Sequence, residues 1–426
     1  MSLKPGYKQT EVGVIPDDWE EVRLGDIGYI FGGLTGKSSE DFGTGNANYI
    51  TFMNVISNVV SKESGVEKVS VGAGEHQSAV LPGDVLFNGS SETPEEVGFG
   101  SVVPQALAGT YLNSFCFGFR PNKDSDLDSK FFAYLTRSSL GREIIRPMAQ
   151  GSTRYNLAKT NLLNGHFPRP PIKEQKAIAE ALSDVDALIN SLEALLIKKR
   201  NIKTGVMQEL LTGRTRLPGF TGDWKEVRLG DLGACLRGVS YKGDSDLSDG
   251  DTPTTVRLLR SNNVQNSLIQ FNDVQYVNHD CVSDEQILRR DDIVICMANG
   301  SKVLVGKTGL FKDSQDIRYT FGAFMGCFRS SSAQANAIFV RYLFLTNQYQ
   351  DYISNLLAGS AINNLAPKSI ESLLFVVPPL NEQKAISAVL SDIDDEIEAL
   401  EKRLAKTRDL KQGMAQELLT GRTRLV

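Results

Sequence analysis

Apolar residues recur every three or four positions along two long segments of the chain, residues 170–217 and 378–425. They occupy two positions of a seven-residue repeat, the arrangement that lines the seam between supercoiled helices. The pattern predicts two long helices with these seam residues: Ile178, Leu182, Val185, Ile189, Leu192, Leu196, Ile386, Leu390, Ile393, Ile397, Leu400 and Leu404. Polar residues interrupt both seams at matching places, namely Lys199, Lys203, Thr407 and Lys411.

The two segments also repeat each other in sequence, aligning without a gap and both ending in QELLTGRTRL. A shorter echo relates DWEEVRLGDIG, from Asp18, to DWKEVRLGDLG, from Asp223. The chain is therefore a module and a long helix, repeated once. Two such helices pair most simply as antiparallel neighbours, with the chain termini close together. The alternative is that each helix packs separately on its own module, but each stripe is longer than one module would cover.

The modules, about residues 20–167 and 225–375, are rich in glycine, serine, asparagine and short β-branched runs. FCFGFR, from Phe115, corresponds to FMGCFR, from Phe324, as a strand in both modules, and one amphipathic helix follows each strand, over 130–142 and 337–355. The predicted fold is α+β: two mostly-β modules with small helices, joined by two long antiparallel coiled-coil helices in a pseudo-twofold, circular order. The predicted domains are residues 1–168, 169–216, 217–376 and 377–426.

Composition limits the possible functions. The net charge is −5, from 46 basic and 51 acidic residues, which argues mildly against nucleic-acid binding unless acidic groups gather elsewhere or a partner supplies positive charge. The five cysteines form no CxxC pair, which is typical of a reduced, cytoplasmic protein. Three dispersed histidines, His76, His166 and His279, predict no metal site. No signal peptide or run of membrane length is evident.

Motifs of catalysis are incomplete. Gly306-Lys307-Thr308 resembles the end of a phosphate-binding loop, but Ser301 stands where that loop needs a glycine. Neither Pro-Pro step has the flanking residues of an amino-methyltransferase, and the histidines have no recurrent catalytic partner. The sequence therefore predicts no catalytic residues.

Several motifs together resemble a known family. They are the PPxxEQxxI start of each long helix, the openers before Trp19 and Trp224, VLPGDVLF from Val80, and GSTRYNL from Gly151. With the duplication, they resemble the specificity (S) subunit of type I restriction-modification systems over the whole chain. The resemblance implies that each module reads one half of a bipartite, asymmetric site on double-stranded DNA. It also implies that the paired helices fix the spacer between the half-sites.

The resemblance further implies partners and no cofactor in this subunit. Two methyltransferase (M) subunits would dock on the helices and carry S-adenosylmethionine. Restriction (R) motor-nuclease subunits would join them and use ATP and Mg. The specificity subunit would contribute no catalysis.

Polar loop residues are the candidates for DNA contact, because base edges are read by side chains that donate and accept hydrogen bonds. The candidates are Lys37, Asn54, Asn88, Ser90, Ser91, Thr153, Arg154, Tyr155, Tyr241, Lys242, Asn262, Asn263, Asn299, Ser301, Lys302, Asn363 and Asn364. A frame of Gly-Ser-x-x-x-Asn-Leu is shared by residues 151–157 and 359–365, but the surrounding residues differ, which suggests two readers of different targets. The alternative is that these loops are ordinary turns.

Two other function classes stay open on the residues alone. The chain could be a two-module scaffold that binds protein or glycan across a coiled-coil spacer, or an enzyme with an unrecognised site. Salt-sensitive DNA binding, strengthened by a methyltransferase subunit, distinguishes the specificity subunit from both.

Overall fold

The computed structural model describes residues 5–105, 109–312, 317–358 and 363–425. Its contacts divide the chain into two compact units. Unit 1 comprises Met1–Glu193 and Lys402–Val426, and unit 2 comprises Ala194–Glu401. Each unit thus contains one module and a portion of both long helices. No helix among the described residues combines the length and apolarity needed to cross a membrane.

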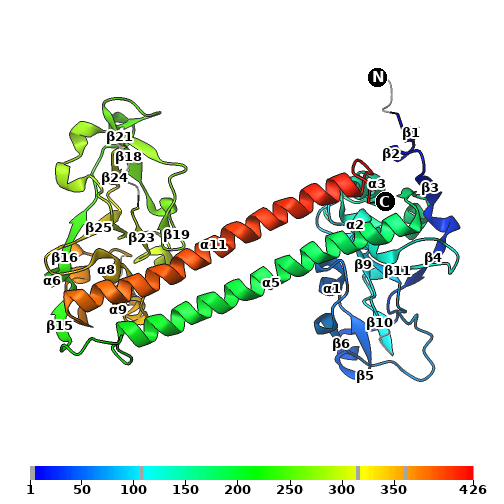
Figure 1. The fold of residues 1–426 in the computed structure, drawn as a ribbon, viewed down its shortest axis with the longest axis horizontal. Helices are drawn as coiled ribbons and strands as arrows, with labels where there is room; N and C mark the ends of the chain where they lie inside the picture. Colours follow the sequence, from blue (N-terminus) through cyan, green and yellow to red (C-terminus); the bar gives the residue numbers. More distant parts are fainter. Residues whose placement is uncertain (1–4, 106–108, 313–316, 359–362, 426) are drawn as a thin grey trace. The chain divides into compact units, whose positions relative to one another are not determined.

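The long helices are α5, Ile172–Leu211, and α11, Leu380–Leu418, drawn in green and in orange to red in Figure 1. Each begins directly after a Pro-Pro step. Each ends before a glycine, Gly213 or Gly421, that has a φ of +70°. A side chain at this φ would be strained, so glycine ends the helix in both copies, as the sequence predicts.

Within each unit, portions of α5 and α11 pair antiparallel. In unit 1, Asp186 and Glu193 of α5 form ion pairs of 2.6 Å with Lys411 and Arg408 of α11, respectively. Residue numbers on α5 therefore increase as those of their partners on α11 decrease, so the two helices run antiparallel. Unit 2 shows the same order through Arg200–Glu401 and Lys203–Asp394, both at 2.6 Å, and through Lys199–Glu396.

The predicted seam residues are all at least partly withdrawn from solvent. Ile178, Leu182, Leu192, Leu196, Ile386, Leu390 and Leu404 are buried, and Val185, Ile189, Ile393, Ile397 and Leu400 are half-buried. At the start of each helix, this stripe joins the core of a module. Ile178 and Leu182 belong to the core of unit 1, and Ile386 and Leu390 to that of unit 2. One stripe therefore serves both as helix seam and as module core.

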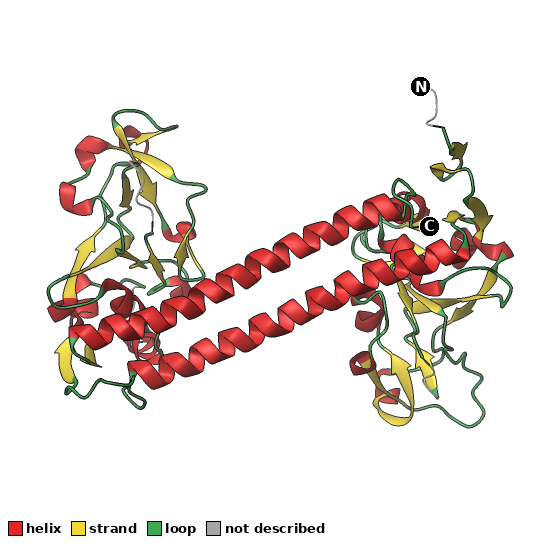
Figure 2. Ribbon diagram, viewed as in Figure 1, coloured by secondary structure: helices red, strands yellow, loops and turns green. Residues whose placement is uncertain are grey.

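Unit 1 is built around a four-stranded sheet in the order β4-β11-β7-β9, with short two- and three-stranded sheets beside it (Figure 2). Its elements are β1 Tyr7–Thr10, β2 Gly13–Pro16, β3 Glu20–Arg23, β4 Gly28–Gly32, β5 Phe42–Ile50, α1 Phe52–Ser57, β6 Val66–Val69, β7 Val85–Asn88, β8 Ser90–Ser91, β9 Gly100–Val102, β10 Thr110–Leu112, β11 Cys116–Pro121, α2 Ser129–Arg137, α3 Ser139–Ile145, β12 Ala149–Gln150, β13 Tyr155–Leu157, α4 Lys159–Asn164 and β14 His166–Arg169.

Unit 2 repeats this plan with a six-stranded sheet in the order β16-β25-β22-β23-β20-β19. Its elements are β15 Lys225–Arg228, α6 Leu229–Leu232, β16 Gly233–Arg237, α7 Gly243–Asp246, β17 Leu247–Ser248, β18 Thr255–Leu259, β19 Val264–Gln265, β20 Leu268–Ile269, β21 Gln275–Asn278, β22 Ile293–Cys296, β23 Thr308–Leu310, β24 Tyr319–Phe321, β25 Met325–Ser330, α8 Ala337–Leu343, α9 Asn347–Ala358, α10 Pro367–Glu371 and β26 Leu374–Val377.

The single helix predicted after each central strand is two helices in the structure. In unit 1, Ser138 ends α2 and caps α3, because its hydroxyl accepts the Gly141 amide at 3.1 Å. A Cβ on Gly141 would lie 1.9 Å from the Leu135 carbonyl oxygen, so the turn between the helices is tightly packed. The apolar period does not show this break, since both short helices bury residues on the same core.

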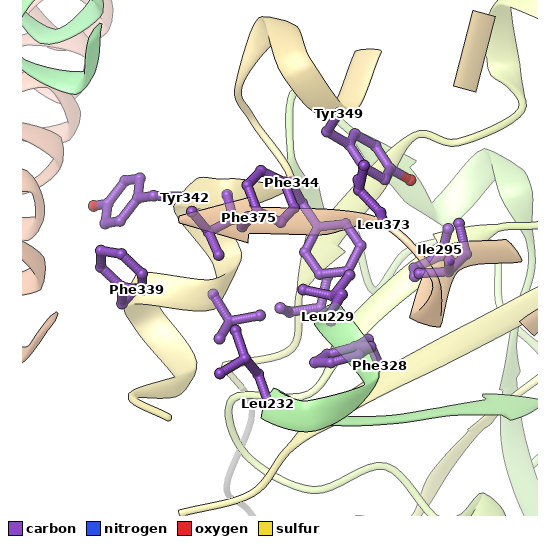
Figure 3. Close-up of a cluster of buried hydrophobic side chains, with 14 of the residues drawn as sticks. Leu229, Leu232, Ile295, Phe328, Phe339, Tyr342, Phe344, Tyr349, Leu373 and Phe375 are labelled. Atoms are coloured by element: carbon purple, nitrogen blue, oxygen red, sulfur yellow. The ribbon is translucent and has the colours of Figure 1, made fainter. Parts of the chain in front are cut away.

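Apolar cores hold each module to its portion of the long helices. Figure 3 shows the core of unit 2, where the ring centroids of Phe328, Phe344 and Tyr349 follow one another at 5.4 and 4.9 Å. Rings at these separations contribute beyond the area that they bury. Unit 1 has a matching chain of rings through Phe132 of α2, whose centroid lies 5.2 Å from that of Phe167.

Described residues near the two ends of the chain meet within unit 1, which confirms the expectation from the circular order. The Tyr7 hydroxyl donates to the Gly421 carbonyl at 3.0 Å, and Arg424 pairs with Asp18 and with the buried Glu174. Unit 2 makes the equivalent contact inside the chain, where Arg216 pairs with the buried Glu382 at 2.5 Å.

Candidate nucleic-acid interface

Three loops meet at one end of the central sheet of unit 1. They are the loop after β7, the turn before β11 and the segment that leads to Leu157. The Gly89 amide donates to the Phe115 carbonyl at 2.9 Å, and the Gly89 carbonyl accepts the Leu157 amide at 2.9 Å. We call this arrangement the loop junction.

Unit 2 builds its loop junction with the same hydrogen bonds. The Met297 amide, after β22, donates to the Phe324 carbonyl at 2.9 Å, and the Met297 carbonyl accepts the Leu365 amide at 2.8 Å. The shared frame of the sequence thus ends at Leu157 and Leu365 in equivalent backbone positions. Residues 359–362 of the second frame lie outside the described residues.

Four of the predicted residues of unit 2 converge on one cavity of about 820 Å³ beside its loop junction. Tyr241, Asn262, Asn299 and Asn363 line the cavity together with Phe324. Arg260 and Asp273, which the sequence did not single out, also line it. The lining combines amide, cationic, anionic and aromatic groups, a mixture that could contact both base edges and phosphates.

Hydrogen bonds position the amides of this cavity. Asn299 donates to the Ser261 hydroxyl at 3.3 Å and accepts the Ser301 amide at 2.9 Å. Asn363 donates to the Gly300 carbonyl at 3.1 Å. Asn262 donates to the Asp273 carboxylate at 2.7 Å. The amides are therefore held in place while they face the cavity.

Other predicted residues of unit 2 lie outside the cavity lining. Lys242, Ser301, Lys302 and Asn364 are exposed. The Lys302 ammonium donates to the Leu357 carbonyl at 3.4 Å. These positions suit contact with a phosphate backbone better than contact with a base inside the cavity.

Three predicted asparagines point inward. Asn54, Asn88 and Asn263 are buried. Asn88 donates to the Glu96 carbonyl at 2.9 Å and accepts the Phe99 amide at 2.7 Å. Asn54 and Asn263 likewise bond to backbone groups of neighbouring turns. Because their amides satisfy buried backbone groups, these residues hold loops in shape and offer no surface to DNA in this structure.

The remaining candidates of unit 1 include both buried and exposed residues. Ser90 and Ser91 are buried, and Ser91 donates to Glu96 at 3.0 Å. Lys37 forms an ion pair of 2.6 Å with Glu75, and its side chain is 2% exposed. This contact, together with hydrogen bonds from Gln77 and the Gly72 amide, lowers the pKa of the Glu75 carboxyl to about 2. Thr153 and Arg154 are exposed, and Tyr155 is half-buried.

Sequence reasoning missed the two most exposed aromatic rings of the loop junctions. Phe115 is 61% exposed and Phe324 is 71% exposed. Each ring stands directly before a strand, β11 or β25, and the sequences of these two strands correspond between the modules. The signal that could have found them is the large apolar residue shared at the end of an otherwise polar loop.

One group of side chains has the geometry of metal ligands, although the histidines predicted no such site. Among the described residues, the ligand atoms of Glu11, Glu21 and His166 lie within 4.8 Å of one another. The His166 Nδ1 lies 2.8 Å from Glu21 and 3.0 Å from Glu11. A histidine between two carboxylates accounts for this geometry, and none of these residues belongs to the loop junction.

Comparison with known proteins assigns the family. The family described as "Type I restriction modification DNA specificity domain" matches residues 16–199 and again residues 221–407. The chain belongs to this family and contains its domain twice, which confirms the resemblance seen in the sequence.

Individual relatives agree with this assignment. The putative type I restriction enzyme MjaX specificity subunit of Methanocaldococcus jannaschii is 27% identical over 438 residues, covering 98% of this chain and 97% of the relative. The EcoKI specificity subunit of Escherichia coli is 30% identical over 201 residues, covering 46% of this chain and 42% of the relative.

Solved structures support the fold. The S subunit of a type I restriction-modification system from M. genitalium matches with a TM-score of 0.58 and 14% identity, over 98% of both chains. At this identity the likeness concerns the fold, which is the predicted combination of two sheet-rich modules and two long helices.

Proposed function

We propose that this chain is the non-catalytic DNA-specificity subunit of a type I restriction-modification enzyme. The observation that carries the proposal is a family domain present twice, in which the same loop junction displays different side chains. Residues 1–168 and 217–376 would be the two target-recognition domains, and residues 169–216 and 377–426 the helical regions. No observation favours the protein- or glycan-binding alternative. A DNA target would place the protein in the cytoplasm.

Each module would read one half of a bipartite, asymmetric DNA site. Asparagine can bond in bidentate fashion to adenine in the major groove, and arginine to guanine. Asn299, Asn363 and Arg260 in unit 2, and Arg154 in unit 1, are the described side chains best suited to this role. Because these side chains differ between the units, the two half-sites would differ as well.

The paired helices would fix the number of unread base pairs between the half-sites. Unbroken helices and ion pairs along α5 and α11 support this role, because a continuous helix transmits distance along its axis. Adding one heptad to both helices lengthens each by about 10 Å. That length corresponds to about three base pairs of spacer. Unchanged half-sites with a longer spacer are expected, whereas altered half-sites with an unchanged spacer would refute the ruler.

Two methyltransferase subunits would dock on the helical regions. In the unit 2 portion of α5, the apolar residues Leu195 and Ile202 are exposed and lie seven residues apart, so they share one face of the helix away from the seam. An exposed apolar stripe on a helix is suited to a protein partner. The methyltransferase subunits would carry S-adenosylmethionine, and restriction subunits would supply the ATP- and Mg-dependent motor and nuclease. This chain would need no cofactor of its own.

The partners would also compensate for the charge of this chain. A net charge of −5 gives little general attraction to DNA. Fluorescence anisotropy with a random-sequence duplex, with and without the methyltransferase subunits, tests the proposal. Salt-sensitive binding that the methyltransferase strengthens is expected. No DNA binding at low salt in either state would reject the proposal.

The target follows from a second experiment. Sequencing the methylated adenines of the host genome should reveal a bipartite motif that disappears when the gene for this chain is deleted. A motif that persists after the deletion would assign specificity to another protein.

A further inference from the structure

The exposed rings of Phe115 and Phe324 occur on equivalent turns. In unit 1, the Asn113 carbonyl accepts the Cys116 amide at 3.0 Å, which closes a four-residue turn. In unit 2, the Gly322 carbonyl accepts the Met325 amide at 2.8 Å and closes the same turn. The phenylalanine is the third residue in both. A single exposed apolar residue is ordinary on a protein surface. The same exposed ring at the same position of two equivalent turns calls for a further explanation.

The surrounding backbone bonds to both turns and packs closely on them. The Gly33 amide donates to the Cys116 carbonyl at 3.2 Å, and the Gly238 amide donates to the Met325 carbonyl at 3.1 Å. A Cβ on Gly33 would lie 2.1 Å from the Asn113 carbonyl oxygen, and the equivalent distance at Gly238 is 1.9 Å. Each turn therefore packs directly on the glycine that follows β4 or β16, and a side chain at that glycine would displace the turn.

The turn sequences differ in every residue except the phenylalanine. Unit 1 has Asn113-Ser114-Phe115, and unit 2 has Gly322-Ala323-Phe324. Residues that read different sequences should differ between the units, as the polar loops do. A ring that both units retain and expose is suited to a task that does not depend on the sequence being read.

The surroundings of both rings suit a nucleic acid. The Arg154 guanidinium lies 5.7 Å from the centroid of the Phe115 ring, so a cation stands beside an exposed aromatic face. Phe324 lines the cavity that also holds Asn299 and Asn363. Aromatic rings stack on any nucleobase, because every base offers a π-face. Basic and amide groups close to such a ring can hold the phosphates and base edges on either side.

We infer that Phe115 and Phe324 each stack on a nucleobase within the half-site of their own unit. This inference rests on the proposed function and adds a contact that is independent of sequence. The ring would enter beside a base pair and disturb its stacking on the next one, as apolar wedges do in duplex DNA. Neighbouring polar side chains would read the sequence.

The test uses the full chain assembled with its methyltransferase subunits. Phe115→Ala and Phe324→Ala are each compared with wild type by anisotropy, on a duplex carrying the genomic methylation motif and on a random duplex. Each substitution should weaken both affinities about tenfold, since stacking does not depend on sequence. Phe115→Trp and Phe324→Trp should keep most of the affinity, because they keep a ring.

A base analogue locates the contact. With 2-aminopurine at successive positions of one half-site, wild type should raise the fluorescence at one position, and only the alanine variant of the corresponding unit should abolish that rise. Met53→Ala removes another exposed apolar side chain of unit 1, outside the loop junction, and should change neither readout. Circular dichroism checks that every variant is folded.

The outcomes separate the two proposals. If wild type binds DNA and the alanine variants bind equally well, or if their methylation motif changes, the stacking inference is wrong and the proposed function stands. If the wild-type complex shows no salt-sensitive DNA binding, both are wrong.

Discussion

The loop after β7 in unit 1 and the loop after β22 in unit 2 occupy the same place in the fold and make an equivalent bridge, Ser90–Asn156 and Ala298–Asn364, but carry different side chains. In unit 1, Ser90 and Ser91 form β8, which pairs with Asn156 and Tyr155 of β13, and both serines are buried. In unit 2, the equivalent loop carries Asn299, which lines a cavity of about 820 Å³. One backbone frame can thus carry buried side chains in one copy and a cavity-lining side chain in the other, which is how duplicated modules can come to bind different targets.

Where the modules meet the long helices, the two units are instead alike. Lys411 and Asp186 form an ion pair of 2.6 Å in unit 1, and the Tyr134 hydroxyl donates to Asp186 at 2.8 Å. In unit 2, Lys203 pairs with Asp394 at 2.6 Å, and the Tyr342 hydroxyl donates to Asp394 at 2.9 Å. These lysines are among the residues that interrupt the predicted seam, so the interruption is a polar connection between α5, α11 and a module helix.

Unit 2 adds one charge to this connection. Arg341 lies 3.0 Å from Asp394, and unit 1 has Ala133 at the matching position. Burial raises the pKa of Asp394, but Lys203, Arg341 and Tyr342 together lower it more, so its pKa lies below that of an ordinary aspartate. Burial raises the pKa of Tyr134 and of Tyr342, which therefore stay protonated and donate.

Exchanging one module gives the largest expected effect. Replacing residues 225–375 with the corresponding module of a relative should change one half-site completely and leave the other unchanged, because each unit has its own loop junction. Sequencing methylated adenines in a host that carries the chimera measures this. A change in both half-sites would show that the modules do not read independently.

Removing the shared carboxylate should affect the two units unequally. Asp394→Ala leaves Lys203 and the buried Arg341 without their partner and should cost about 3 kcal/mol. Asp186→Ala leaves only Lys411 and Tyr134, so a smaller loss is expected. Calorimetry, which can resolve the unfolding of two units, makes the comparison. Asp395→Ala, at an exposed neighbouring position of α11, is the control and should change stability by less than about 0.5 kcal/mol.

Two asparagine substitutions compare a side chain that lines the cavity with one that is buried at the end of β7. Asn363→Ala should lower discrimination at one base pair of the unit 2 half-site by about 1–3 kcal/mol, because its amide lines the cavity. Asn88→Ala should instead lower the thermal stability of unit 1, since that amide satisfies buried backbone groups. Anisotropy on a set of singly mismatched duplexes and thermal unfolding separate these effects. Equal losses of discrimination in both variants would remove the distinction between the two asparagines.

The smallest expected effect is a difference in how steeply wild type and Asp394→Asn lose stability at low pH. Because the pKa of Asp394 is lower in the folded state, its contribution to stability is complete above about pH 4, the unfolded value, and is lost as the pH falls through the folded value. Wild type should therefore lose stability in this range more steeply than Asp394→Asn. Unfolding midpoints measured between about pH 2 and pH 5 give the two slopes, and parallel slopes would show that other carboxylates account for the loss.

The sequence alone determined the duplicated architecture. The seven-residue period gave the seam, and the Pro-Pro steps with Gly213 and Gly421 gave both helix ends, because helix geometry imposes its period and its caps on neighbouring residues. The mixed fold class followed from the same contrast between long periodic segments and short strands. What the local pattern could not show was that one predicted helix divides at Ser138, since packing of Gly141 decides that turn.

Only the tertiary structure decided which loop side chains face outward. Asn88 ends β7 and Asn299 lies just after the equivalent strand β22, yet Asn88 bonds to buried backbone groups and Asn299 lines a cavity. Phe115 and Phe324 look like strand residues in sequence and are exposed. The direction of a loop side chain depends on backbone groups from other turns that come close only after folding, whereas a helix period is set by residues already adjacent in the chain.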